Sequence, residues 1–294
     1  MKEEKKSELK PQKDLVIKLD WGLGRNIAMT WLITAVAKQR PVRVVCSRPC
    51  AFRWNPYIKS IHWLSDRRLF QDVIKWNDYI ELEPYTNPKF FNDWVNWLEI
   101  VREQLWLDKI YYPELYLADR EKSEYQLQCN NGCSQKIILF QPFGSTMTIN
   151  GSDKSYRSIP IDQAQYMVNE LNKKGYTVFT CESDKQPQLM WVNSLRQVTD
   201  LRFLIWLAYR YPVLWADSCM HHASVWFGKK PTVLRAGTDS GRFGYDEREF
   251  NYREFAMKEY TPMRLPMNDF DFDNSNQWTN NFSIEFLDKI LANF

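Results

Sequence analysis

The sequence predicts an α/β protein with two Rossmann-like domains. The prediction rests on two similar beginnings, at residues 14–20 and 136–140, where a short apolar strand leads into a loop and then a helix. Each helix leads into a further strand, and strands that alternate with helices form parallel sheets. Two beginnings of this kind predict two sheets, each in its own domain.

In the first beginning, the strand at 14–20 is followed by the loop Gly22-Leu23-Gly24. A helix is predicted over 27–39 and a strand over 42–46. Asn26 stands where it would cap that helix. Ile27 occupies the place of the last glycine in the Gly-x-Gly-x-x-Gly motif, which argues against a dinucleotide oxidoreductase.

In the second half, a polar loop follows residue 140, and a helix over 161–174 and a strand over 176–180 are predicted. Another strand–helix–strand unit covers 211–234, with Gly228 as the helix stop. The aromatic run at 90–107 has helical spacing of its apolar residues and is expected to pack in the core. The polar stretch at 121–134 is the expected linker. We therefore expect a mobile tail at 1–13, an N-terminal domain at 14–125 and a C-terminal domain at 135–294.

The composition is that of a globular protein, with 44% apolar and 26% charged residues. No apolar run reaches the roughly 20 residues of a membrane span, and no signal-peptide segment follows the start. A cytoplasmic protein without a transmembrane segment is expected. The pairs Cys46/Cys50 and Cys129/Cys133 have spacings that are poor for zinc and no nearby histidines, so we expect reduced thiols and no metal.

Asp217 and Ser218 follow the apolar run at 211–215 and precede a helix that carries His221 and His222. This turn lies at the carboxyl end of a strand, where open α/β sheets bind ligands. The exposed N–H groups of a helix start attract anions, above all phosphate. The plainer alternative is a βα turn with a capping aspartate and a packed histidine.

The same stretch resembles the nucleotide-sugar motif of the ADP-heptose heptosyltransferases, glycosyltransferase family 9. The family pattern reads Asp-Ser-Gly-x-x-His, then Gly-x-Pro-Thr-Val, and here Cys219 replaces the first glycine. Weaker matches are the glycine loop at 22–24, the Asn55-Pro56-Tyr57 segment, and Arg157 three places before Pro160. The resemblance implies a GT-B fold, in which two Rossmann-like domains with parallel sheets face a central cleft. It also implies a metal-independent glycosyltransferase without cofactor, with a nucleotide-diphosphate sugar as co-substrate.

Sugar transfer needs a base that takes the proton of the acceptor hydroxyl. In the family this base is an aspartate directly after the glycine loop, but this chain has Arg25 there. Asp20, at the end of the first strand, is the candidate that replaces it. Arg25 is expected to hold an anionic group beside it. A loop carboxylate that bonds backbone amides or pairs with Arg25 is the alternative for Asp20.

Stabilisation of the leaving diphosphate points to the second domain. The candidate donor-binding residues share a position in a loop or at a helix start after a predicted strand: Ser145, Thr146, Lys154, Arg157, Glu182, Asp217, Ser218 and His222. His221 is expected to point elsewhere. A solvated charged loop is the alternative for Lys154 and Arg157, and a core histidine is the alternative for His222.

Charge is uneven along the chain, because residues 1–70 hold 15 lysines and arginines against 6 acids. A basic excess attracts an anionic acceptor. The candidate acceptor-binding residues lie in or near this region: Trp21, Gly22, Gly24, Asn26, Arg48 and Arg53. The resemblance favours a phosphorylated glycolipid at the inner membrane or another glycan. The interleaved aromatic residues also fit DNA, as in phage enzymes that glycosylate hydroxymethylated bases in the host cytoplasm, and a non-catalytic binding protein of the same fold is the third possibility.

Overall fold

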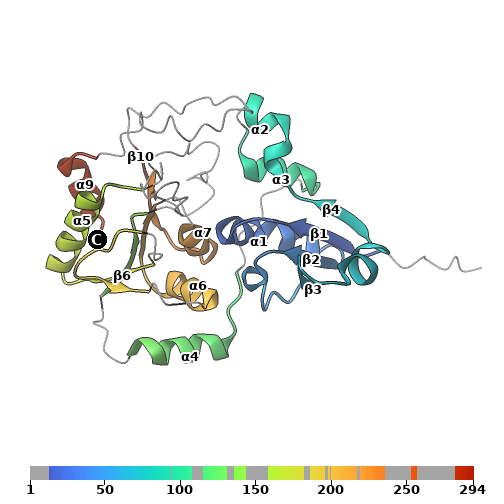
Figure 1. Ribbon diagram of the computed structural model, residues 1–294, viewed down its shortest axis with the longest axis horizontal. Coiled ribbons are helices and arrows are strands. Elements are labelled where there is room, and N and C mark those ends of the chain that lie inside the picture. Colours follow the sequence, from blue (N-terminus) through green and yellow to red (C-terminus); the bar gives the residue numbers. More distant parts are fainter. Residues whose placement is uncertain are drawn as a thin grey trace, which may run out of the picture.

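The computed structural model describes residues 13–93, 95–107, 115–130, 136–143, 158–181, 186–195, 198, 200–216, 219–235, 253–256 and 282–294 (Figure 1). The tail expected at 1–13 lies outside these residues except for Lys13. Two separate sheets organise the described part of the chain.

The first sheet has four parallel strands in the order β3-β2-β1-β4. They are β1 (Leu15–Leu19), β2 (Val42–Cys46), β3 (Ile58–Trp63) and β4 (Asp78–Glu81). β1 and β2 are almost wholly buried, as central parallel strands are when both faces are covered. One face packs against α1 (Leu23–Ala37), and the other packs against η2 (Phe70–Ile74).

The second sheet has six parallel strands in the order β10-β9-β8-β5-β6-β7. Numbered from its first strand, this is the Rossmann order 3-2-1-4-5-6 read from the β7 edge. The bounds are β5 (Ile137–Gln141), β6 (Thr177–Thr180), β7 (Asn193–Ser194), β8 (Val213–Ala216), β9 (Thr232–Arg235) and β10 (Arg253–Ala256).

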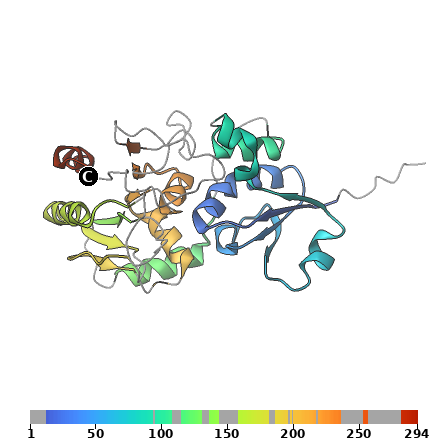
Figure 2. The same ribbon diagram turned by 45° about the horizontal axis from the view of Figure 1, so that its top comes forward.

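Helices cover both faces of the second sheet. On the outer side lie α5 (Ile161–Lys173) and α9 (Ile284–Leu291), and on the side of the first sheet lie α6 (Leu201–Arg210) and α7 (Cys219–Trp226) (Figures 1 and 2). No helix in the described part of the chain combines the length and the apolar character that crossing a membrane requires.

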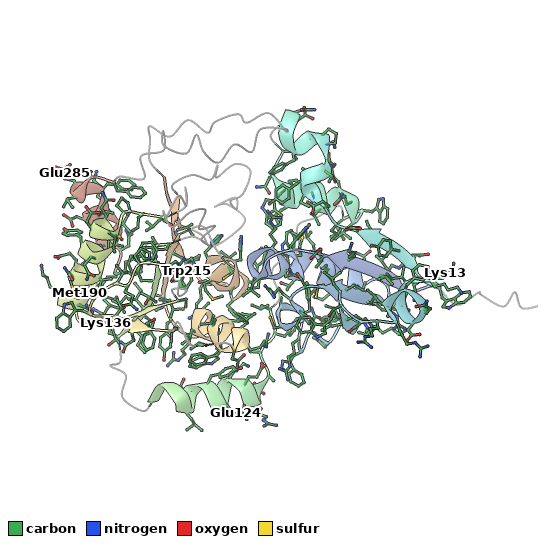
Figure 3. All side chains as sticks on the ribbon, viewed as in Figure 1. Lys13, Glu124, Lys136, Met190, Trp215 and Glu285 are labelled. Carbon is green, nitrogen blue, oxygen red and sulfur yellow. The ribbon has the colours of Figure 1, made fainter. Side chains whose placement is uncertain are left out.

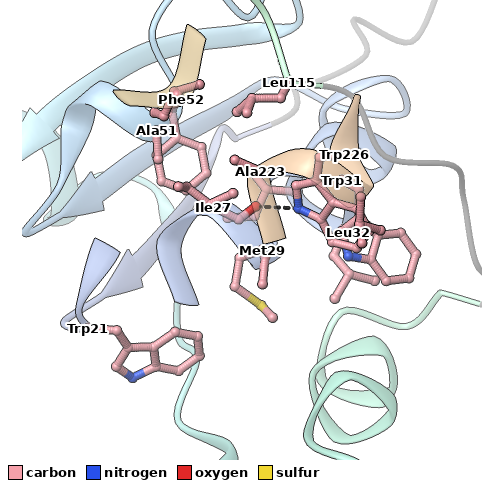
Figure 4. Packing of buried hydrophobic residues seen from close by; sticks show 14 of the residues in the cluster. Trp21, Ile27, Met29, Trp31, Leu32, Ala51, Phe52, Leu115, Ala223 and Trp226 are labelled. Atoms are coloured by element: carbon pink, nitrogen blue, oxygen red, sulfur yellow. Dashed lines mark hydrogen bonds between the residues drawn. The ribbon is translucent and has the colours of Figure 1, made fainter. Parts of the chain in front are cut away.

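The two halves are joined through α1 and α7. The indole Nε1 of Trp226 donates a hydrogen bond of 2.6 Å to the carbonyl oxygen of Ile27, and the ring of Trp226 meets Trp31 edge-on (Figure 4). Residues all around α1, from Asn26 to Val36, are buried. A helix that is buried on all sides has neighbours on all sides, so α1 is a shared core element of both halves.

The strand–helix–strand unit predicted over 211–234 is confirmed as β8, α7 and β9, with β8 and β9 parallel. Gly228 follows the end of α7 and has a φ of +70°, and its N–H donates to the carbonyl oxygen of Val225. This left-handed conformation is favourable for glycine and explains the stop.

Three predicted elements differ from the structure. α1 begins at Leu23 instead of residue 27. The helix expected within 90–107 is two helices, α2 (Pro88–Asn92) and α3 (Trp97–Gln104), because the Asn96 side chain accepts the N–H of Leu98 and starts a new helix. The stretch expected as a linker is mostly α4 (Asp119–Asn130), whose Tyr125 packs on Phe203 and Trp206 of α6.

Four of the six cysteines lie among the described side chains, and none of these four is in a disulfide: Cys46, Cys50, Cys181 and Cys219. Burial raises the pKa of the Cys46 thiol to about 12, and it also raises the pKa of Cys50. Such thiols stay protonated near neutral pH and are inert. The first C-x3-C pair forms no disulfide in the structure.

Candidate functional site

The strand order of the first sheet reverses between β1 and β4, and open α/β sheets bind ligands at the carboxyl edge of such a switch point. Asp20 and Trp21 follow β1 there, and Glu83 follows β4. The indole Nε1 of Trp21 donates to Oε2 of Glu83 at 2.9 Å, which ties the two strand ends together. Trp21 is buried and Asp20 is exposed, so the carboxylate is the accessible group of this pair.

The side chain of Asn26 holds the glycine loop in place through hydrogen bonds to the backbone. Its amide nitrogen donates to the carbonyl oxygens of Trp21 and Gly22, at 2.7 and 3.1 Å, and Ser47 Oγ also donates to Trp21. Asn26 is fully buried as the fourth residue of α1, whose N-cap is Gly22. The side chain therefore positions the loop and does not cap the helix.

The guanidinium of Arg25 lies over two aromatic rings, those of Tyr85 and Trp21, which together we call the aromatic shelf. Its guanidinium carbon is 4.0 Å from the ring centroid of Tyr85 and 5.9 Å from that of Trp21, both within cation–π range. The N–H of Tyr85 is held by Oε1 of Glu83 at 3.1 Å. Within the described residues no ion pair joins Arg25 to Asp20, so the pairing considered for these two side chains is not formed.

In the second sheet the order reverses between β5 and β8. Gln141 ends β5 and is buried. Its amide nitrogen donates to the carbonyl oxygen of Phe143 at 2.9 Å, and its amide oxygen accepts the N–H of Cys181 at 3.0 Å. This one side chain fixes the carboxyl ends of β5 and β6 relative to each other.

Most predicted donor-binding residues fall on segments that lie outside the described residues: Ser145, Thr146, Lys154, Arg157, Glu182, Asp217 and Ser218. The strands that precede these segments in the sequence, β5, β6 and β8, are described. β5 and β8 are neighbours, with Gln141 opposite Trp215. Of the predicted donor-binding residues, His222 is the one that the structure describes.

The glycine loop of the first half lies directly against the start of α7. A β-carbon on Gly24 would stand 3.1 Å from Cα of Cys219 and 3.3 Å from Cδ2 of His222. The Gly-x-Gly loop therefore has a packing role as well, because a β-carbon at Gly24 would make a tight contact that these two helix starts would have to relieve by a small shift. Two motifs about 200 residues apart in the sequence thus meet, and Figure 1 shows α1 and α7 side by side.

His222 lies at this contact and is largely buried. Its ring meets Trp97 of α3 edge-on, with 6.4 Å between centroids. The ring of His221 is 3.9 Å away, although the sequence suggested that this side chain points elsewhere. The two imidazoles form a buried pair between the halves, with a tryptophan of the first half against it.

Much of the basic excess of the first half is paired away from the site. Arg43 and Lys59 both bond Asp14, at 2.7 and 2.8 Å, and Arg40 bonds Asp78 at 2.6 Å. Asp14 precedes β1 and Asp78 begins β4, so these pairs lie at the amino edge of the sheet. Burial raises the pKa of Asp14, but hydrogen bonds from its two cations outweigh burial and lower it overall. These three cations are therefore engaged by two carboxylates at the amino edge, away from the site.

Arg48 and Arg53 are exposed and belong to the segment after the carboxyl end of β2, around η1 (Pro49–Ala51). The guanidinium carbon of Arg53 is 5.0 Å from the ring centroid of Trp54. No ion pair to either arginine occurs in the described part of the chain. Like Arg25, they lie near the carboxyl edge of the first sheet, on the side of the candidate site.

A buried arginine connects the two halves of the molecule through several hydrogen bonds. We call this region, around α4, α6 and η1, the junction. Arg202 of α6 is 3% exposed and bonds Glu121 of α4 through Nε and Nη2, at 3.1 and 2.7 Å. It also donates to the carbonyl oxygens of Cys50 and Tyr116. One guanidinium therefore joins η1, the segment before α4, and the second half.

Sequence reasoning missed several residues of this region: Glu83, Tyr85, Trp97, Gln141 and Arg202. Glu83 and Gln141 carried a usable signal, because each is a polar residue at or just after the end of a predicted or possible strand. The others reach the site through packing between segments far apart in sequence, which no local pattern records.

No protein-family model and no curated protein matches the sequence. Solved structures do match. Escherichia coli ADP-heptose lipopolysaccharide heptosyltransferase II is 14% identical over 96% of this chain and 99% of its own, with a TM-score of 0.63. A glycosyltransferase family 9 protein of Veillonella parvula is 13% identical over 83% and 86%, also with a TM-score of 0.63.

A third structure is the dodecameric iron-containing heptosyltransferase TibC of enterotoxigenic E. coli, in complex with ADP-D-β-D-heptose. It is 11% identical over 97% of this chain and 78% of its own, with a TM-score of 0.64. Identities this low establish the fold alone. The chain is thus a sequence-divergent α/β protein with the two-sheet GT-B fold of the family 9 heptosyltransferase structures.

Proposed function

We propose that this protein is a glycosyltransferase that moves a sugar from a nucleotide-diphosphate sugar to a hydroxyl of an anionic acceptor, a glycolipid or another glycan. The observation that carries the proposal is the contact of Gly24 with Cys219 and His222. It joins the helix starts that follow β1 and β8, so the ligand-binding edges of both sheets belong to one region. Two substrates that must react with each other need such a shared region.

The donor is assigned to the second half. Asp217, Ser218 and His222, with Ser145 and Arg157, surround the diphosphate or ribose in this proposal, and Thr146, Lys154 and Glu182 add contacts at the edges. The start of α7 supports it, because the N–H groups of a helix start stabilise a leaving diphosphate. The structure of TibC, which has a similar fold, was solved in complex with ADP-D-β-D-heptose.

The acceptor is assigned to the first half, with Asp20 as the base. The exposed carboxylate at the end of β1 supports this role, since the acceptor hydroxyl must reach it. Arg25 on its aromatic shelf, Arg48 and Arg53 are the cations for the anionic part of the acceptor. Trp21, Gly22, Gly24 and Asn26 then shape and fix the loop beneath it.

A DNA acceptor is the second candidate. The exposed stack of Arg53 on Trp54 favours it, because cations interleaved with aromatic faces bind single-stranded nucleic acid. Transfer assays with a phosphorylated glycolipid and with hydroxymethylated DNA, each with a labelled donor, distinguish the two acceptors.

Calorimetric titration with ADP, UDP, GDP and CDP and with their sugar conjugates tests the donor assignment. One nucleotide series should bind, and the double variant Ser218→Ala/His222→Ala should weaken it several-fold, since a charge-assisted hydrogen bond contributes roughly 1.5–3 kcal/mol. The pair Ser60→Ala/His62→Ala, a hydrogen-bonded serine and histidine on β3, is the matched control. Unchanged affinity in the folded Ser218/His222 variant would remove the assignment.

A further inference from the structure

Three described residues other than glycine have a positive φ, and all three are tryptophans: Trp54 (67°), Trp106 (54°) and Trp191 (61°). Their exposed fractions are 52%, 76% and 79%. A bulky side chain is strained in this left-handed region, where glycine is at ease. An exposed side chain gains little packing that would offset the strain, so each position needs another explanation.

Two of the three are accounted for locally. The Trp54 side chain hydrogen-bonds Glu121 and stacks on Arg53. Trp106 follows the end of α3, where its N–H bonds the carbonyl oxygen of Glu103 in an ordinary helix-end turn. Trp191 is different, because it lines a surface groove.

The groove has a volume of about 680 Å³ and lies between the end of α5 and β7. Its lining residues are Asn169, Asn172, Lys173, Trp191, Val192 and Asn193. Lys173 ends α5 and Asn193 begins β7, so the groove lies at the amino edge of the second sheet, opposite the candidate site. Figure 3 shows the neighbouring Met190 on the outer side of the second half, away from the contact of α1 with α7.

The backbone that carries Trp191 is held by side chains of α5. Gln165 bonds both the N–H and the carbonyl oxygen of Met190, at 2.7 and 3.1 Å, and Asn172 Nδ2 donates to the carbonyl oxygen of Trp191 at 3.0 Å. These three bonds anchor the backbone at Met190 and Trp191, at the place where Trp191 lines the groove. The aromatic face is therefore presented in a fixed place.

We propose that this groove binds a sugar ring of a neutral glycan, stacked on Trp191 and hydrogen-bonded by the asparagines. The C–H face of a sugar ring carries partial positive charge and fits the negative face of an indole. The recorded bonds use Oδ1 of Asn169 and Nδ2 of Asn172. This leaves a donor, Asn169 Nδ2, and an acceptor, Asn172 Oδ1, and sugar hydroxyls both accept and donate.

The charge of the groove selects a neutral ligand. Lys173 is its one cation, and it is paired with Glu170 at 2.6 Å. A nucleic acid would need cations free to contact its phosphates, so the groove does not have the character of a DNA site. Binding of a glycan in this groove does not depend on sugar transfer. The groove would be a second saccharide-binding site, separate from the candidate site between the two sheets.

Binding is tested with the full chain on an array of defined neutral and acidic oligosaccharides and single-stranded DNA. The wild type should be retained by neutral saccharides, and Trp191→Gly should lose at least tenfold of that signal. Trp106→Gly is the matched control, because it removes a similarly exposed tryptophan that also has a positive φ. This variant should bind saccharides as the wild type does.

Thermal unfolding gives the second readout. Trp191→Gly should melt at or above the wild-type Tm, since glycine relieves the strain, and nucleotide-sugar turnover should be unchanged. Retention of saccharides by Trp191→Gly, retention by DNA alone, or no retention by any saccharide would each overturn the proposal. So would a Tm lowered by more than about 2–4 °C, the shift of a real packing defect in a chain of this size, because Trp191 would then be a packing residue.

Discussion

Gly24 approaches Cys219 so closely that a β-carbon on the glycine would lie 3.1 Å from the Cα of the cysteine. The neighbour is backbone, at the first residue of α7, and not the end of a flexible side chain. A methyl group on Gly24 would therefore push the starts of α1 and α7 slightly apart. We propose that this contact fixes the position of the two sheets relative to each other, and with it the position of their substrate-binding edges.

Gly24→Ala should therefore destabilise the protein by about 1–3 kcal/mol, the usual cost of overpacking. It should also weaken donor binding, because α7 has to move. Gly22→Ala is the matched control: nothing lies within 4 Å of its β-carbon, and its φ of −62° suits any residue. Urea unfolding and calorimetry measure the two effects, and equal behaviour of the two variants would show that the close approach is unimportant.

Asp20→Asn should cut turnover by roughly 10²–10⁴-fold, the worth of general-base catalysis, with donor affinity little changed. The asparagine keeps the size of the side chain but cannot take a proton. Asp93→Asn changes another exposed aspartate of the first half and should leave turnover as it is. Near-normal turnover in Asp20→Asn would move the base to another acid or to the substrate.

Arg25→Ala should raise the KM for the acceptor and reduce the salt dependence of the rate, since it removes a cation from the binding edge. Arg25→Lys keeps the charge but loses the planar stacking on Tyr85, so it should keep the salt dependence with a smaller rise in KM. Initial rates at several salt concentrations give both quantities. A lowered Tm with unaltered KM would indicate that Arg25 only supports the aromatic shelf.

Local patterns predicted the strands and helices that carry this region. The apolar strand at 15–19 and the stop at Gly228 come from chemistry that acts within a few residues. The start of α1 was misplaced because Asn26 has the usual side chain of a cap. The structure instead uses it inside the helix to bond the loop carbonyls. A capping residue and an internal loop anchor look alike in sequence.

Long-range relations could not be predicted in this way. Asp14 pairs with Arg43 and Lys59 from two other strands, so two of the basic residues that looked available to a partner are engaged within the sheet. The register of a parallel sheet decides such pairs, and the sequence does not state it. The same holds for Arg202, whose guanidinium bonds three groups that lie far from it in the sequence: the Glu121 carboxylate and the carbonyl oxygens of Cys50 and Tyr116.

The buried pair of Arg202 and Glu121 should make stability depend on acid. Burial raises the pKa of Glu121, but hydrogen bonds from Arg202 and Trp54 outweigh it, and the pKa is lower than usual. A carboxyl with a lowered folded pKa contributes stability that is complete above its unfolded pKa and is lost as the pH falls through the folded value. We expect this loss below about pH 4.5, the ordinary range of a glutamate.

Glu121→Gln should remove that part of the acid dependence and lower stability at pH 7 by about 3–5 kcal/mol, because Arg202 remains buried without a countercharge. Glu124→Gln breaks an exposed pair with Arg120 on the same helix and should change little. Urea unfolding between pH 3 and pH 7 compares them. Parallel pH curves for wild type and Glu121→Gln would show that the pair does not control the junction.

Release of nucleoside diphosphate from a panel of nucleotide sugars tests the central proposal most directly. The wild type should slowly hydrolyse one nucleotide-sugar series in the absence of acceptor, since the site activates the donor for attack and water replaces the missing hydroxyl. Ser218→Ala/His222→Ala should lose this activity, whereas Ser60→Ala/His62→Ala should retain it. If no nucleotide sugar is turned over by the folded wild type, with or without a phosphorylated glycolipid or hydroxymethylated DNA, the protein is not a glycosyltransferase of the proposed kind.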